Sequence, residues 1–123
     1  MGHGKPVLSI RIKLSETAWL GPGKIRLMEL IQELGSISAA GRAMSLSYRR
    51  AWMLAEDLNA AFDEPPIVTK TGGSQGGGAV LTQFGRELIN CYRRIENAAA
   101  RDAAVEMSRL PMPAEGSARE RGI

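Results

Sequence analysis

The amino-acid sequence predicts an α+β fold that is mainly α, and three observations support this prediction. Apolar residues recur at helical spacing over several segments, and shorter segments have the composition of strands. A glycine-rich stretch, "KTGGSQGGGAVLT" (residues 70–82), joins two of those strands. The chain has 123 residues, of which 44% are hydrophobic and 24% charged. These values are typical of one globular domain that buries a core.

Composition also narrows the classes of function. The single cysteine, Cys91, cannot form an internal disulfide, and with His3 as the only histidine the sequence offers no zinc site and no nucleophile set. We therefore expect no metal, no cofactor and no enzymatic activity, and we expect a cytoplasmic location. Residues 1–10 lack the pattern of a signal peptide and no apolar segment has membrane-spanning length, so we expect neither a leader nor a membrane span. The net charge of +3 favours a polyanionic partner.

The N-terminal region predicts a strand followed by a helix. Residues 7–15 alternate between apolar and polar side chains, which is typical of a half-buried strand with Leu8, Ile10, Ile12 and Leu14 on one face. A turn is expected at residues 21–23, where a proline stands between two glycines. The next helix has Leu27, Met28, Ile31 and Leu34 at helical spacing and should end at Gly35.

Two helices in quick succession are expected after Gly35. The first, "SISAAGRAM", can be capped by Ser36 or Ser38, and the second, "YRRAWMLAEDLNAAF", by Ser47. Alanines make the first helix narrow, so the second can cross it closely. A short helix of small residues, a tight turn and a longer capped helix together predict a helix-turn-helix.

The glycine-rich stretch then joins the predicted strands "PIVTKT" and "AVL". Pro65 and Pro66 end the preceding helix, and the plain interpretation of the two strands is a β-hairpin with a long tip of small residues. Directly after a helix-turn-helix, such a hairpin predicts the wing of a winged helix-turn-helix. We expect a two- to three-stranded antiparallel wing sheet.

A long C-terminal helix completes the domain, which we place at residues 1–110. Thr82 can cap this helix, expected at about residues 83–110, and it is longer than the core of so small a fold requires. Its excess length predicts a dimerisation helix, and its apolar stripe supplies the expected dimer interface of Leu88, Cys91, Tyr92, Ile95 and Ala99. We expect Cys91 to be a small buried side chain, and residues 111–123 to be a disordered tail.

This architecture predicts binding to double-stranded DNA. A helix-turn-helix places the start of its second helix in the major groove, where arginine can bind guanine edges or phosphates. The expected contacts from the two helices are Ser36, Ser38, Ser47, Tyr48, Arg49, Arg50 and Trp52. Glycine amides of the wing can approach the DNA backbone closely, so the expected wing contacts are Lys70, Thr71, Gly72, Gly73, Ser74, Gln75 and Gly76.

Other interpretations of the same residues stay open. Arg49 and Arg50 are also compatible with a solvated helix face, and Trp52 with the edge of the core. The glycine loop is compatible with a merely permissive hairpin tip. A nucleotide-binding loop is disfavoured, because the stretch lacks the Lys-Ser/Thr ending of a P-loop and precedes a strand where a helix would be needed.

Several motifs in order carry a family resemblance. "GSISAAGRAMSLSYRRAW", "LNAAF", "KTGGSQGGGAVLTQFGREL" and "YRRIE" together resemble the N-terminal DNA-binding domain of the ModE family of molybdate-responsive transcription regulators, itself similar to the winged helix of LysR-type regulators. The resemblance implies a homodimer whose long helices pair outside the winged-helix cores, and whose recognition helices and wings engage a palindromic operator. Gly41 stands where such helices usually have alanine, which is expected to loosen the short helix by about 1 kcal/mol.

The chain departs from this family at its C-terminus. Family members that sense molybdate carry small β-barrel domains after the linker helix, and this sequence stops near that boundary, so we expect no molybdate sensing by this polypeptide. The resulting prediction is a sequence-specific transcription regulator of ModE type without a molybdate-binding domain. The alternatives are a winged-helix module that binds a protein partner, and an oxyanion- or molybdate-binding protein. The latter is disfavoured because no cluster of His, Cys or carboxylate groups lies near the glycine loop.

Overall fold

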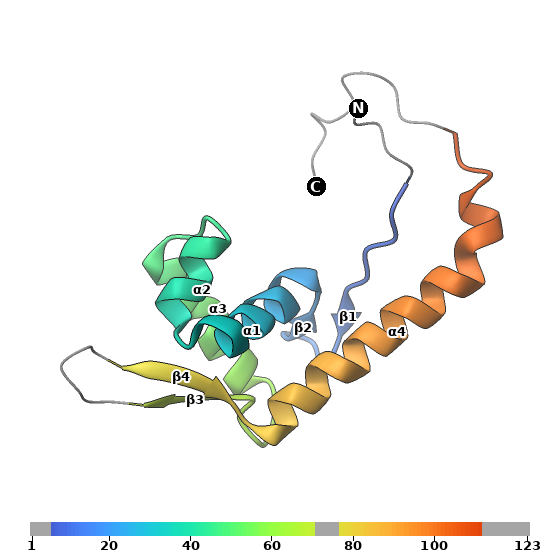
Figure 1. Ribbon diagram of the computed structural model, residues 1–123. Coiled ribbons are helices and arrows are strands. Elements are labelled where there is room, and N and C mark those ends of the chain that lie inside the picture. Colours follow the sequence, from blue (N-terminus) through green and yellow to red (C-terminus); the bar gives the residue numbers. More distant parts are fainter. Residues whose placement is uncertain (1–5, 71–76, 112–123) are drawn as a thin grey trace.

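The computed structural model describes residues 6–70 and 77–111, and it confirms the predicted α+β fold that is mainly α (Figure 1). Along the chain the elements are β1 (Ile12–Lys13), β2 (Trp19–Leu20), α1 (Pro22–Leu34), α2 (Ile37–Ala43), α3 (Tyr48–Ala60), β3 (Ile67–Lys70), β4 (Gly78–Leu81) and α4 (Gln83–Met107). Helices α2 and α3 form the helix-turn-helix, and β3 and β4 form the wing. In Figure 1 both lie on one side of the molecule, opposite the outer end of α4.

Local signals set the ends of the helices as the sequence predicts. Gly35 ends α1 in the left-handed conformation, with φ of 85°. Ser36, rather than Ser38, caps α2: its hydroxyl accepts a hydrogen bond from the amide of Ala39. Ser47 caps α3 by accepting from Arg50, and Thr82 caps α4 in the same way. Each cap satisfies an amide that the first turn of a helix leaves unpaired.

The core lies where α1 meets the helix-turn-helix, the wing and the start of α4. Its largest fully buried side chains share an apolar character and come from α1, α3, the wing and α4; they are Ile25, Leu27, Met28, Ile31, Leu58, Pro66, Ile67 and Tyr92. Burying such side chains is the main favourable contribution to folding. Because every one of these elements contributes, the helix-turn-helix and the wing share a single core.

Gly41 has a packing role that the sequence did not show. This residue is buried in α2, and a β-carbon built on it would lie 2.6 Å from the β-carbon of Ala51 in α3. The glycine therefore permits the close crossing of the two helices. The expectation that Gly41 only loosens α2 is incomplete, since alanine at this position would push α3 away from α2.

The wing is a two-stranded antiparallel sheet in which Ile67 pairs with Leu81 and Lys70 with Gly78. Two backbone hydrogen bonds hold its base. The amide of Ala79 donates to the carbonyl of Gly35, at 2.9 Å, and the amide of Thr82 donates to the carbonyl of Pro66, at 3.0 Å. The first bond holds β4 against the end of α1.

The N-terminal strand is much shorter than the sequence predicts. Instead of residues 7–15, only Ile12–Lys13 form a strand, which pairs with Trp19–Leu20 and not with the wing. Leu14 is consequently exposed. Before it, the carbonyl of Ile10 accepts a hydrogen bond from the Tyr92 hydroxyl of α4 at 2.6 Å, so this carbonyl is bonded to a helix and not to a partner strand.

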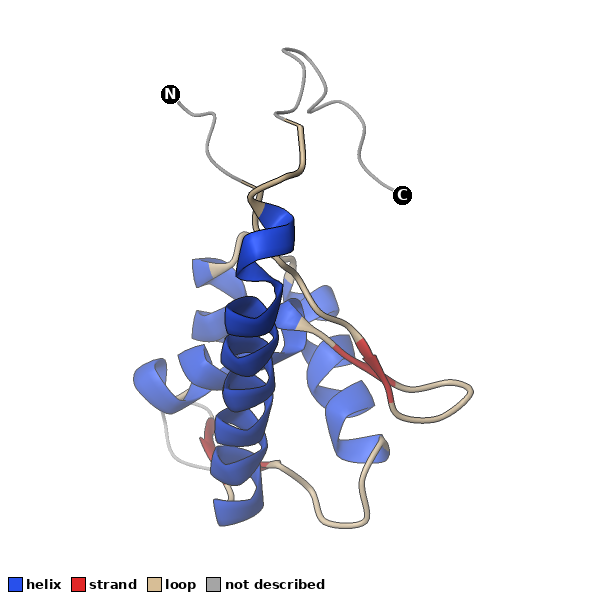
Figure 2. Cartoon of the chain, turned by 90° about the vertical axis from the view of Figure 1, so that its right-hand side faces the viewer, coloured by secondary structure: helices blue, strands red, loops and turns tan. Residues whose placement is uncertain are grey.

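Helix α4 has 25 residues and ends at Met107, three residues before the expected end. Its first half packs on the core, where Gly85, Ile89 and Tyr92 are buried, whereas its second half extends beyond the winged helix (Figures 1 and 2). Cys91 is exposed, so the prediction that it is buried was wrong. It is adjacent to Tyr92 and therefore points about 100° away from the buried face. No helix in the described part of the chain is long and apolar enough to cross a membrane.

Candidate nucleic-acid interface

The first turn of α3 presents polar and basic side chains to solvent. Tyr48 is 68% exposed, and Arg49 and Arg50 are also exposed. The same helix buries Ala51, Ala55 and Leu58 on its other side, so its orientation is fixed by the core. The exposed first turn combines a helix N-terminus, capped by Ser47, with two guanidinium groups, which is an arrangement suited to phosphates and base edges.

Tyr48 and Trp52 form an aromatic pair along α3. Their ring centroids are 6.1 Å apart and their planes are tilted by 53°. Trp52 is partly buried and packs against the core, so it contributes to the core edge. Its indole N–H is buried with no hydrogen-bond partner in the described protein. Tyr48, in contrast, extends from the pair into solvent.

The serines of α2 and α3 have unequal surroundings. Ser36 and Ser47 use their hydroxyl oxygens as helix caps, at 2.9 Å from the Ala39 amide and 3.0 Å from the Arg50 amide. Each hydroxyl hydrogen stays available for donation to a phosphate. Ser38 lies partly buried in the first turn of α2. All three serines belong to the two helices of the helix-turn-helix.

The wing contributes Lys70, which ends β3 and is exposed. The other expected wing contacts lie outside the described residues; they are Thr71, Gly72, Gly73, Ser74, Gln75 and Gly76. Gly78, at the start of β4, lies close to α1, since a β-carbon built on it would be 3.1 Å from the carbonyl oxygen of Gly35. The described base of the wing is therefore held beside the end of α1.

Asn59 is a positioning residue that reasoning from the sequence missed. Its side-chain amide donates to the Ile67 carbonyl at 2.9 Å, and its oxygen accepts from the Ile67 amide at 3.1 Å. This pair of bonds imitates the bonding of a neighbouring strand and ties α3 to β3. A polar residue between the apolar positions of α3 was the available signal, but no pattern along the chain identifies its partner.

The expected dimer-interface residues do not share one environment. Tyr92 is 1% exposed and belongs to the core, and Leu88 packs partly against that core. Ile95 is 42% exposed and Cys91 is exposed, whereas Ala99 is partly buried. Ile95 and Cys91 therefore offer apolar surface outside the core, and Tyr92 offers almost none.

An ion-pair network fixes α4 to α1. The Arg93 guanidinium donates to both carboxylate oxygens of Glu29, at 3.0 and 2.9 Å, and to Glu96 at 2.7 Å. The hydrogen bonds from Arg93 lower the pKa of Glu29, and those same bonds raise the pKa of Arg93. Burial raises the pKa of Tyr92. Among the described residues, no group of three or more His, Cys, Asp or Glu side chains is placed to hold a metal ion.

Sequence comparison identifies several relatives. The chain is 42% identical to the molybdenum transport protein ModE of Azotobacter vinelandii over 77 residues, covering 63% of this chain and 28% of that protein. It is 35% identical to the DNA-binding transcriptional dual regulator ModE of Escherichia coli K12 over 83 residues, covering 68% and 32%. It is 40% identical to the molybdenum-pterin-binding protein MopB of Rhodobacter capsulatus over 84 residues, covering 68% and 31%.

The chain thus spans about a third of the length of the curated relatives that it matches. No protein-family model matches it. The relatives' names describe regulation, transport and binding, and none of the three names an enzyme.

Proposed function

We propose, from the premise that this chain belongs to the ModE family, that it is a sequence-specific transcription regulator which binds double-stranded DNA. Helix α3 enters the major groove and the wing contacts the DNA backbone beside it. The site of action is the cytoplasm, and binding serves regulation and not catalysis. A homodimer on a palindromic operator completes the proposal.

The observation that supports this proposal best is the orientation of α3. The core holds one side of the helix through Ala51, Ala55 and Leu58, which leaves the guanidinium groups of Arg49 and Arg50 in solvent. Here Asn59 also attaches the wing to the same helix, so α3 and the wing can engage DNA as one rigid unit.

Replacing Arg49 and Arg50 with alanine tests the major-groove assignment. We expect the affinity for a selected operator to fall about 5- to 150-fold for each arginine, because a bidentate contact to guanine contributes about 1–3 kcal/mol of discrimination. Affinity for unrelated duplexes should fall much less. Arg94→Ala, at an exposed position on α4, removes one charge elsewhere and serves as the control. An unchanged operator affinity in the double variant would exclude α3 as the recognition helix.

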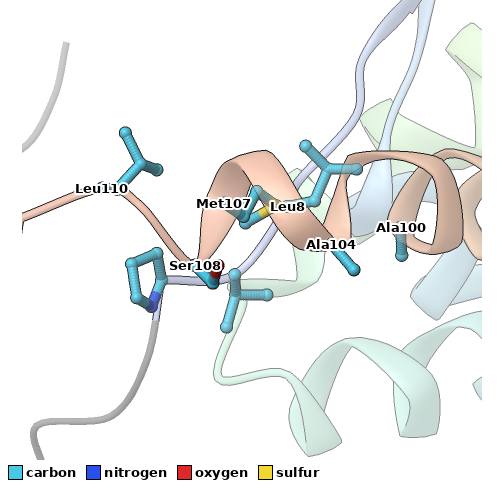
Figure 3. Close-up of a pocket in the computed structure, with 8 residues that line it drawn as sticks. Leu8, Ala100, Ala104, Met107, Ser108 and Leu110 are labelled. Atoms are coloured by element: carbon cyan, nitrogen blue, oxygen red, sulfur yellow. The ribbon is translucent and has the colours of Figure 1, made fainter.

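Dimerisation is proposed to use the outer half of α4 and the N-terminal segment beside it. Pro6, Val7 and Leu8 run next to the end of α4 and leave an apolar groove of about 620 Å³, which Ala104, Met107 and Leu110 also line (Figure 3). Val7 is 85% exposed and Val105 is 66% exposed. A second copy of the chain would cover these side chains and remove their apolar surface from water.

The mass of the protein in solution tests this part of the proposal. Sedimentation at micromolar concentration should give the mass of two chains, and the operator selected from genomic fragments should be a palindrome. A monomeric mass together with a single half-site would contradict the dimer. We also expect molybdate to leave the affinity unchanged, because the residues assigned here contact DNA or a second copy.

A further inference from the structure

A second basic surface lies beside α3, on the flank away from the wing. It is a cleft of about 580 Å³ between the hairpin of β1 and β2, the first turn of α1, and α3. The residues that matter for its chemistry are Arg11, Trp19, Lys24, Leu46, Arg50 and Asp57. Arg50 belongs to the exposed first turn of α3, so the cleft is continuous with the proposed DNA interface. No pattern in the sequence assigned Arg11 or Lys24 to a function.

Trp19 organises the cations of this cleft. The Arg11 guanidinium carbon lies 4.5 Å from the centroid of the indole ring, and the Lys13 ammonium lies 5.6 Å from it. The Lys24 ammonium donates to the Trp19 carbonyl at 3.1 Å. A cation over an indole ring is held by the electrostatic field of the ring and still has donors directed to solvent. Arg11 and Lys24 are therefore preplaced and retain free donors.

The two flanks of α3 face different hairpins. Arg50 and Asp57 are seven residues apart and so lie on one flank, where both line the cleft. Asn59 lies on the other flank and bonds to β3. Figure 2 shows the hairpin of β1 and β2 on one side of the molecule and the wing strands on the other. DNA that receives α3 in its major groove would thus pass a hairpin on each flank of this helix.

We propose that the cleft binds a phosphate of the DNA backbone, on the strand that flanks the major groove on the side away from the wing. The proposal rests on the function proposed above and adds Arg11 and Lys24 to it as phosphate-binding residues. Arg11, Lys24 and Arg50 supply three cationic groups, against the carboxylate of Asp57. An open cleft with excess positive charge beside a recognition helix is complementary to a backbone phosphate.

The test uses the double variant Arg11→Gln and Lys24→Gln, which removes both charges and keeps long aliphatic stems against Trp19. Each phosphate that a protein neutralises contributes about 0.9 to the steepness of log affinity against log salt, so loss of this one phosphate contact should lower the steepness by about 0.9. Between about 50 and 200 mM salt the affinity of the variant should therefore decrease about 3.5-fold less than that of the wild type. The preferred sequence should not change, since a phosphate contact carries no direct sequence information.

Arg26→Gln paired with Arg94→Gln is the matched control, because it removes two exposed charges that line neither the cleft nor the outer half of α4. If the slopes of the two double variants are equal, the cleft does not bind phosphate, although the DNA-binding function would stand. If the wild-type protein binds no duplex at any salt concentration, the proposed function itself fails and the inference fails with it.

A second measurement changes the DNA and compares the wild type with the same double variant. Single methylphosphonate substitutions remove one charge at a time from the operator backbone, and the wild type should lose affinity at a phosphate flanking the α3 contact on the side away from the wing. The Arg11→Gln, Lys24→Gln protein should be insensitive at that position. Equal sensitivity of both proteins would overturn the inference. A second result would also overturn it. If inorganic phosphate stabilised the wild type but not the variant, and both proteins bound DNA equally well, the cleft would bind a free anion and not the DNA backbone.

Discussion

The two hairpins that flank α3 are held in place by different interactions. The wing is attached through uncharged hydrogen bonds: Ala79 to the Gly35 carbonyl, and the Asn59 side chain to both backbone groups of Ile67. The hairpin of β1 and β2 has strands of two residues each and is organised around Trp19 by cations. Because the bonds that hold the wing lie at its base, the sequence of its tip can consist of small residues. In the N-terminal hairpin, by contrast, Arg11 and Lys13 both carry positive charge and pack on Trp19.

The largest effect is expected where the wing meets α4. A β-carbon on Gly85 would overlap the carbonyl oxygen of Pro66, which is backbone and cannot turn aside. Gly85→Ala should therefore lower the free energy of unfolding by about 3 kcal/mol, despite the better helix propensity of alanine. Chemical denaturation measures this. The matched control is Gly23→Ala beside the other hairpin, where a β-carbon meets nothing within 4 Å. Equal stabilities of the two variants would mean that the base of the wing is not tightly packed.

An intermediate effect is expected for the bond between α3 and the wing. Asn59→Ala leaves the amide and carbonyl of Ile67 without their partner, and unpaired groups of this kind cost about 2 kcal/mol of unfolding free energy. Affinity for DNA should also fall, equally for operator and unrelated sequence, because the wing loses its orientation to α3. Asn90→Ala, exposed on α4, is the control. A variant at position 59 that behaved like this control would show that other contacts suffice to place the wing.

The smallest effect is expected at the attachment of the N-terminal hairpin to α4. Tyr92→Phe removes one hydrogen bond, from the hydroxyl to the Ile10 carbonyl, and should cost about 1 kcal/mol of unfolding free energy. Tyr48→Phe changes an exposed hydroxyl and should be nearly neutral.

The effect of Tyr92→Phe should also depend on pH. Burial raises the folded pKa of Tyr92 above the ordinary value of 10.0, so the bond contributes fully below about pH 10 and is lost as the pH rises through the folded pKa. Denaturation curves between neutral and alkaline pH measure this difference. A stability difference between wild type and Tyr92→Phe that increased above pH 10 would contradict the burial of the phenol.

The elements that the sequence predicted well are those fixed by short-range interactions. The end of α1 at Gly35 and the caps at Ser47 and Thr82 depend on contacts within three or four residues, which the sequence displays directly. The N-terminal strand was predicted too long because alternation of apolar residues shows a preference for a strand but not the presence of a partner. The same reasoning missed the exposure of Cys91, since an apolar stripe does not show which of its residues the core will cover.

The sequence by itself determined the order of the four helices and the two wing strands, the helix-turn-helix and the basic first turn of α3, because periodicity and capping act between near neighbours. Only the tertiary structure decided which distant groups meet. Arg93 pairs with Glu29, the Tyr92 hydroxyl bonds to the Ile10 carbonyl, and Gly41 leaves space for Ala51 of the crossing helix α3. Arg11 and Lys24 likewise come to line one cleft with Arg50, beside α3. Such contacts depend on closing long loops and on the close packing of whole elements, and no local pattern records them.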